Sequence, residues 1–195
     1  METHPNHNHL YEIAENQAGY FTNRQARAAG FSRERLSYYA SIGRFIRIQP
    51  GVYRLVQFPG SPYEDLFVAW LRAGSNSVIS HESALALYEL SDVLPGEVHV
   101  IIPRISSRRR SGIRLHTNRL RPDEITTREG LPVTTVVRTI SDVAASDLPE
   151  EQVSQAIHEA LDRGLINREE LLTQAERRKG RAKQMIDSIL NAVLP

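Results

Sequence analysis

Residues 20–56 have the sequence YFTNRQARAAGFSRERLSYYASIGRFIRIQPGVYRLV, and this stretch decides the fold of the N-terminal part of the chain. Thr22 is a good N-cap, and Gln25 three residues later completes a capping box, so a short helix is predicted to follow. Gly30 ends this helix, because glycine adopts the left-handed conformation at little cost. Ser32 then caps a second helix. The order of helix, glycine-containing turn and helix is typical of a helix-turn-helix.

The second helix of this stretch has one apolar and one polar face. Leu36, Tyr39 and Ala40 share a face at helical spacing, and arginine, serine and tyrosine side chains occupy the opposite face. An apolar seam behind such groups is what a helix in the major groove of DNA needs. From the two helices we expect the DNA-binding residues to be Arg24, Ser32, Arg33, Arg35, Ser37, Tyr38 and Ser41.

A β-hairpin is predicted to follow the two helices. Residues 44–48 and 52–55 form its strands, and Pro50 and Gly51 between them suit a type II turn. This hairpin would be the wing of a winged helix-turn-helix, with three arginines directed toward phosphates: Arg44, Arg47 and Arg54. A helix-plus-hairpin unit that mediates only protein contacts is the alternative.

The chain has 195 residues, a net charge of +1 and 41% hydrophobic residues. It contains no cysteine, which excludes disulfides and thiolate metal sites. It has no apolar run of membrane-spanning length and no signal-peptide pattern at its start, so we expect a cytoplasmic protein without a membrane partner. We expect two domains, residues 1–58 and residues 59–195, in an α+β fold. The first is the winged helix-turn-helix, and the second is a mixed domain with a small β-sheet covered by helices.

Positive charge is concentrated in two segments. Residues 1–57 carry +3, from seven Arg against four Glu, and residues 102–121 carry +7, from seven Arg and no acid. The second basic patch consists of Arg104, Arg108, Arg109, Arg110 and Arg114. Two interpretations stay open for it: a solvated basic loop, or a surface for nucleic acid or an acidic partner.

Several elements of the second domain are predicted. Ser61 would cap a helix, and residues 98–103 and 113–116 would form two strands of a hairpin. Arg138 and Asp142 stand four residues apart on a helix and can pair, which makes Asp142 a structural carboxylate. Pro149 and Asn167 would open further helices that cover the sheet.

Three histidines close together near the start of the chain could bind a metal ion. His4, His7 and His9 lie in what we interpret as a frayed polar terminus, and His81 is interpreted as a capping or surface-contact residue. No Walker A loop, GxGxxG, ExK motif or serine–histidine–aspartate spacing is present. We therefore expect no enzymatic activity, no catalytic residue, no metal and no cofactor.

Three phrases of the chain resemble the AbiEi family, the antitoxins of type IV toxin–antitoxin systems. They are GFSRERLSYYASIGRFIRIQPGVYRL at residues 30–55, SHESALALYEL at residues 80–90 and GLPVTTVVRTISDVA at residues 130–144. The resemblance implies a winged helix-turn-helix repressor that binds inverted repeats in its own promoter. It also implies a second domain that carries the antitoxin function and supports cooperative binding to double-stranded operator DNA. The toxin of this family is a nucleotidyltransferase, which the antitoxin antagonises indirectly rather than in a stable complex.

A function of a different class is the alternative. The arginine-rich strip at residues 104–121 would then bind an acidic protein or RNA, and the chain would be a non-enzymatic interaction module.

Overall fold

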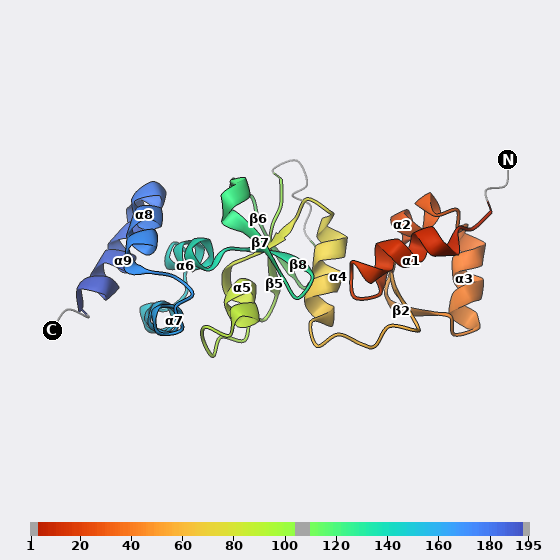
Figure 1. The fold of residues 1–195 in the computed structure, drawn as a ribbon, viewed down its shortest axis with the longest axis horizontal. Helices are drawn as coiled ribbons and strands as arrows, with labels where there is room; N and C mark the ends of the chain where they lie inside the picture. The colour runs from red at the N-terminus through yellow and green to blue at the C-terminus, as the bar shows by residue number, and fades with distance from the viewer. Residues whose placement is uncertain (1–3, 104–109, 193–195) are drawn as a thin grey trace. The chain divides into compact units, whose positions relative to one another are not determined.

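The computed structural model describes residues 4–103 and 110–192 of the chain. It is a mixture of helices and strands (Figure 1), which confirms the predicted α+β class. None of the helices in the described ranges combines the length and the apolar character that crossing a bilayer requires.

Backbone contacts divide the chain into two units. The first extends to Ser75 and includes Glu129–Leu131, and the second comprises Asn76–Arg128 and the chain from Pro132 onward. The predicted boundary lies between residues 58 and 59, whereas this division keeps the following helix in the first unit.

The first unit contains four helices and three strands among its described residues. In chain order they are α1 (His7–Glu15), β1 (Tyr20–Thr22), α2 (Asn23–Ala28), α3 (Arg33–Ser41), β2 (Phe45–Gln49), β3 (Val52–Leu55) and α4 (Glu64–Ala73). The strands form an antiparallel sheet in the order β1-β3-β2. Figure 1 shows α1, α2 and α3 grouped beside this sheet. The predicted capping box of Thr22 and Gln25 is present, and Gly51 has a φ of +87° in the hairpin turn.

Aromatic side chains form the centre of the first unit. Phe21 stacks on Tyr53, and both Phe21 and Phe31 pack against Phe45 with ring centroids 5.1 and 5.7 Å apart. Leu36 of α3 is buried in the same cluster. Burial of each such side chain contributes about 1.5–3 kcal/mol, so the cluster fixes α3 against the sheet.

Strand β1 was not predicted, and it explains why α4 belongs to the first unit. Tyr20 of β1 is fully buried and stacks on Phe67 of α4 with ring centroids 5.4 Å apart. The helix begins at Glu64 rather than at Ser61, so the predicted serine cap is wrong. The Ser61 hydroxyl instead accepts a hydrogen bond from the Tyr63 amide, which forms a turn ahead of the helix.

The N-terminal histidines are part of helix α1, so the prediction of a frayed terminus is wrong for His7 and His9. Asn6 caps α1 by accepting a hydrogen bond from the His9 amide, and the Asn6 amide donates to the Ala29 carbonyl at 2.8 Å. Nε2 of His7 lies 3.1 Å from the hydroxyl of Tyr39. These contacts order the polar segment against the helix-turn-helix.

The second unit contains a five-stranded sheet with strands in the order β6-β5-β4-β8-β7. Its strands are β4 (Val78–Ile79), β5 (Val98–Ile101), β6 (Ile113–His116), β7 (Ile125–Arg128) and β8 (Leu131–Thr134). Strands β5 and β6 lie where they were predicted, but they pair in parallel and not as a hairpin. Alternation of apolar and polar residues predicts a strand but contains no information on the direction of its partner.

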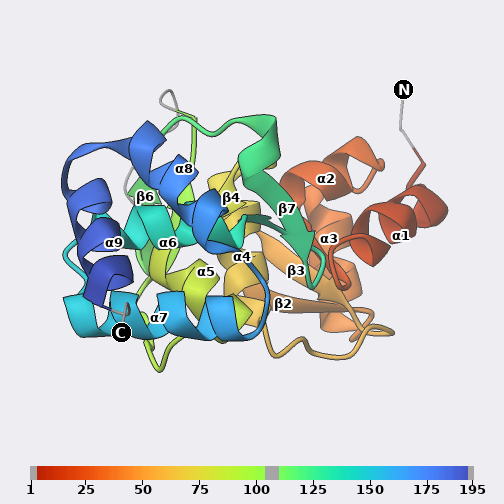
Figure 2. The same ribbon diagram turned by 60° about the vertical axis from the view of Figure 1, so that its left-hand side comes forward.

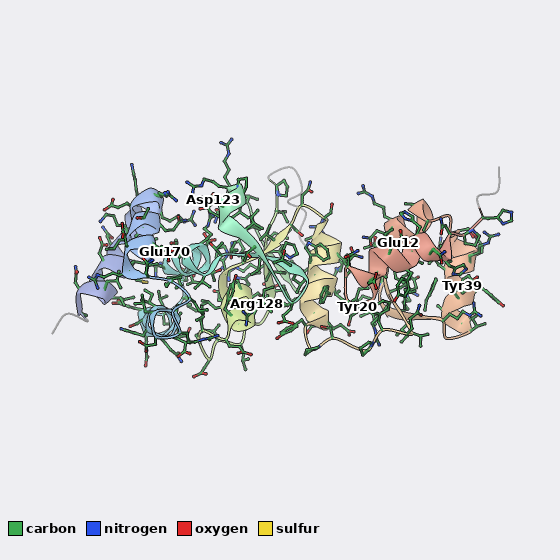
Figure 3. All side chains as sticks on the ribbon, in the orientation of Figure 1. Glu12, Tyr20, Tyr39, Asp123, Arg128 and Glu170 are labelled. Atoms are coloured by element: carbon green, nitrogen blue, oxygen red, sulfur yellow. The ribbon has the colours of Figure 1, made fainter. Side chains whose placement is uncertain are left out.

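Helix α6 (Val136–Ala144) is the centre of the helical part of the second unit. It packs against α5 (His81–Tyr88), α7 (Glu150–Asp162), α8 (Arg168–Arg178) and α9 (Gly180–Ala192). Figure 2 shows α8 and α9 beside α6. The helix starts predicted at Pro149 and Asn167 are confirmed; Glu170, labelled in Figure 3, completes a capping box with Asn167.

A buried ionic network joins these helices. The predicted pair of Arg138 and Asp142 is present, with Nε of Arg138 donating to Oδ2 of Asp142 at 2.9 Å. Nη1 of Arg138 also donates to Glu124 at 2.8 Å, and Arg178 of α8 donates to Asp142 at 2.5 Å. Asp142 thus lies between two guanidinium groups, the arrangement expected of a structural carboxylate.

Candidate nucleic-acid interface

Helix α3 presents a polar stripe of five exposed residues. Ser32 starts the helix by accepting a hydrogen bond from the Arg35 amide at 3.3 Å, and Leu36 anchors it in the core with 2% exposure. The polar residues of the helix that turn away from the core are exposed. These are Arg33, Glu34, Ser37, Tyr38 and Ser41.

Two of the predicted DNA-binding residues on this helix make contacts within the protein or are partly buried. Arg35 is half-buried, one position before Leu36, so its stem lies beside the core. The hydroxyl of Ser41 donates to the Tyr38 carbonyl at 2.8 Å, which holds the last turn of the helix. Tyr38 is 59% exposed and projects the largest surface of the stripe.

The wing supplies two exposed arginines, Arg44 and Arg47. Arg47 lies on β2, and Arg44 precedes this strand with its guanidinium 5.9 Å from the ring centre of Tyr39. Arg24, also exposed, lies on α2. Arginine donates several hydrogen bonds in a planar fork, which suits phosphate oxygens and guanine edges.

Arg54 differs from the other wing arginines. Its Nη1 atom donates to the Phe58 carbonyl at 2.6 Å, and the guanidinium lies 6.0 Å from the ring centre of Tyr20. It lies on the central strand β3 and is half-buried. These contacts give Arg54 a structural role, so we leave it out of the candidate interface.

One carboxylate lies on the recognition helix. Hydrogen bonds from its own backbone amide and from the Ser32 hydroxyl hold the pKa of Glu34 below its usual value. A negative charge in the first turn of a helix interacts favourably with the helix dipole. The same charge repels phosphates, so the contacts to the DNA backbone depend on the arginines around it.

The second basic patch is described only in part. Arg104, Arg108 and Arg109 lie outside the described residues, Arg110 is half-buried, and Arg114 is exposed on β6. Arg114 pairs in register with His99 of β5.

The structure also brings together three residues that the sequence analysis did not combine. His81, His99 and His116 lie on separate elements of the second unit, and a nitrogen atom of each lies within 4.8 Å of those of the others. The interpretation of His81 as a capping or surface-contact residue is wrong, because its side chain is buried and only 4% of the residue is exposed. Residues so distant in the sequence meet through strand pairing and helix packing, which their spacing does not show.

Three short helices followed by a hairpin that closes a three-stranded sheet make the first unit a winged helix-turn-helix domain. Residues 8–56 match the family model described as transcriptional regulator, AbiEi antitoxin. The N-terminal region of this chain is therefore similar to the transcriptional regulators of the AbiEi antitoxin family.

A solved structure with a similar fold is the crystal structure of RV2827C protein from Mycobacterium tuberculosis. The similarity covers 94% of this chain and 75% of that chain, with a TM-score of 0.59 and 16% sequence identity. At this identity the similarity is one of fold, and it extends through both units. No curated protein matches the chain significantly.

Proposed function

We propose that this protein is an antitoxin that represses its own operon by binding inverted repeats in the promoter. The exposed stripe of α3 enters the major groove, where Arg33, Ser37 and Tyr38 meet base edges and nearby phosphates. Arg24, Arg44 and Arg47 hold the DNA backbone. The observation that supports this most is that α3 exposes arginine, serine and tyrosine side chains on one face while its other face packs in the core. The domain that contains this helix matches the model of a regulator family.

The second unit, in this proposal, supports cooperative binding of neighbouring copies to the repeats. It also carries the antagonism of a nucleotidyltransferase toxin, as in a type IV system, without a stable complex between the two proteins. The protein acts in the cytoplasm, where the promoter DNA and the toxin are. Support for these finer points comes from the family of the N-terminal region and from the phrases at residues 80–90 and 130–144.

The experiment is fluorescence anisotropy with labelled DNA from the gene's own upstream region, compared with a scrambled fragment at near-physiological salt. A specific repressor should bind its operator about a thousand-fold or more tighter than the scrambled DNA. Equal, weak binding to both fragments would reject operator binding and favour the interaction module with an acidic protein or RNA partner.

Arg33→Ala tests the recognition helix in the same assay. If Arg33 makes a bidentate base contact, the variant should lose about 1–3 kcal/mol of discrimination between the two fragments. Arg181→Ala is the matched control, because Arg181 is an exposed arginine on α9 in the other unit. An unchanged ratio in Arg33→Ala would remove this residue from the base-contacting set.

A further inference from the structure

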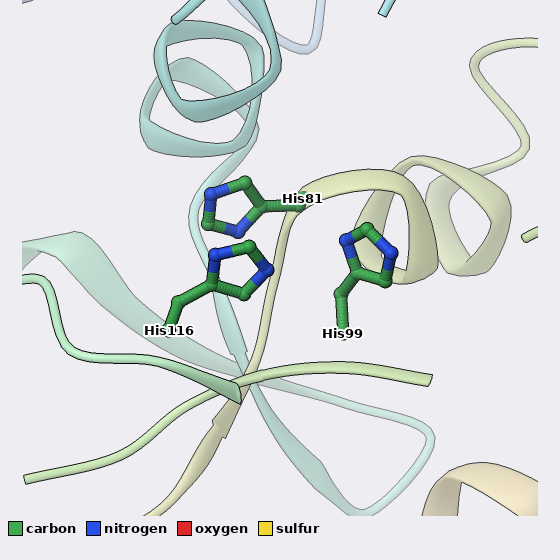
Figure 4. Close-up of side chains that lie close together, drawn as sticks. All are labelled: His81, His99 and His116. Atoms are coloured by element: carbon green, nitrogen blue, oxygen red, sulfur yellow. The ribbon is translucent and has the colours of Figure 1, made fainter. Parts of the chain in front are cut away.

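Three histidine rings meet in the second unit. His81 opens α5, His99 lies on β5, and His116 ends β6 (Figure 4). The ring centroids of His81 and His116 are 3.6 Å apart, and His99 is 5.2 Å from His116 and 5.9 Å from His81. One nitrogen from each ring falls within 4.8 Å of the other two.

The register of the sheet places two of the rings on one face. Ile101 pairs with His116 in the parallel ladder of β5 and β6, and paired residues point to the same face. His99 is two residues before Ile101 and therefore shares that face. The two histidines are diagonal neighbours on adjacent strands.

Helix α5 is fastened to this position through the backbone of His99. The His99 amide donates to the Ser83 hydroxyl at 2.8 Å, and the His99 carbonyl accepts from the Ser80 amide at 3.0 Å. His81 adopts a φ of 50°, which is uncommon for a residue other than glycine and costs about 1–3 kcal/mol in general. This conformation directs the start of the helix so that the His81 ring stacks on that of His116.

Burial favours the neutral form of two of the three rings, His81 and His116. Burial is the main cause that lowers the pKa of His81 to about 2 and that of His116 to about 4, so both are neutral at pH 7. Nε2 of His116 is buried without a hydrogen-bond partner among the described residues. A buried polar atom in this state is costly unless a ligand satisfies it.

A carboxylate accompanies the rings. Oε2 of Glu82 contacts Nδ1 of His99, and hydrogen bonding to His99 helps to keep the pKa of Glu82 below its usual value although burial acts to raise it. Metal-binding histidines commonly have a carboxylate partner that orients the ring and balances the charge of the ion.

We propose that His81, His99 and His116 form a binding site for a divalent first-row transition metal ion of the Zn²⁺ type, with Glu82 as its charge-balancing carboxylate. Three imidazole nitrogens suit this class of ion, which tetrahedral sites bind at about 2.0–2.1 Å from nitrogen. The ion would bridge the start of α5 and the strands β5 and β6.

Two features of the surroundings bear on the site. Arg138 and Arg178 lie close enough to lower the pKa of His81, and each is ion-paired: Arg138 with Glu124 and Asp142, and Arg178 with Asp142. The rings of His81 and His116 are nearly parallel, at 11°, so a shared ion requires one ring to turn about χ2. That torsion has a broad, roughly two-fold profile in histidine.

The test uses the metal-free full-length chain titrated with ZnCl₂ in a calorimeter. The four other histidines provide controls: a tail variant with His4→Gln, His7→Gln and His9→Gln, and the single variant His158→Gln. Both should bind one ion per chain like the wild type. His116→Gln and His99→Gln should bind more than about 10-fold more weakly, and Glu82→Gln about 10- to 100-fold more weakly.

Zinc-edge X-ray absorption on the loaded tail variant identifies the ligands without a substitution in the cluster. Because only four histidines remain in that variant, a spectrum with three imidazole ligands assigns the ion to the cluster. Absence of stoichiometric binding to the wild type, or binding that is lost in the tail variant and kept in His116→Gln, would overturn the proposal. If His116→Gln fails to fold, the absorption spectrum decides: an oxygen-only shell rejects the site.

Discussion

The hydroxyl of Tyr20 donates a hydrogen bond of 2.9 Å to Oε2 of Glu64, which joins strand β1 to helix α4. The same hydroxyl accepts from the Ser61 amide at 3.2 Å. One buried phenol therefore holds both the start of α4 and the turn that precedes it. Through this contact the helix that follows the wing becomes part of the winged domain.

Tyr20→Phe should lower the free energy of unfolding by about 1–2 kcal/mol, because it leaves the Ser61 amide and the Glu64 carboxylate without their buried partner. Urea unfolding of the full chain measures the change. Tyr11→Phe is the control, since Tyr11 is 39% exposed and should alter the stability little. Equal stability of the two variants would contradict a structural role for the Tyr20 hydroxyl.

Asn6→Ala should destabilise helix α1 by about 0.5–2 kcal/mol, because it removes the N-cap that accepts from the His9 amide. Asn8→Ala, in the exposed first turn of the same helix, is the matched control. Thermal unfolding compares the two variants. A loss of stability confined to Asn6→Ala is expected, and identical melting temperatures would argue against the cap.

Arg47→Ala and Arg54→Ala should distinguish an arginine that contacts DNA from one that stabilises the fold. Arg47 is exposed on the wing, so its loss should weaken binding to operator and random DNA alike. The salt slope, which is the slope of the logarithm of the binding constant against the logarithm of the salt concentration, should become about one unit shallower. Arg54→Ala should instead lower stability by about 1–3 kcal/mol, because the partly buried Phe58 carbonyl loses its donor. The proposed assignment fails if Arg54→Ala reduces the salt slope as much as Arg47→Ala does.

Glu124→Gln should reduce stability at neutral pH more than at low pH. Burial acts to raise the pKa of Glu124, but hydrogen bonds from the Arg121 amide, Gln174 and Arg138 outweigh it and lower the pKa below its ordinary value. A lowered pKa means that the ionised carboxylate stabilises the fold above about pH 4.3, the usual value for Glu. This contribution is lost as the pH falls through the lowered pKa.

Urea unfolding of wild type and Glu124→Gln at several pH values tests this. The difference in stability should be largest near pH 7 and should shrink below about pH 4. Glu129→Gln, an exposed carboxylate at a turn, should show no such trend. A difference that is constant with pH would indicate that ionisation of Glu124 plays no part.

The sequence by itself determined the local elements of the DNA-binding domain. The capping box of Thr22 and Gln25, the cap at Ser32 and the turn at Gly51 are set by neighbours three or four residues apart, which a sequence displays directly. The same holds for the ion pair of Arg138 and Asp142, one helical turn apart.

Only the tertiary structure decided which distant residues meet. Arg54 looks like its neighbours in the wing, yet strand order places it on the central strand beside Tyr20 and Phe58. His99 and His116 meet because β5 and β6 pair in parallel, and His81 joins them because the start of α5 is bonded to the His99 backbone, neither of which the alternation of residues specifies. The spacing of apolar residues along the sequence indicates which face of a helix or strand is buried. Which other element packs on that face depends on contacts between distant parts of the chain.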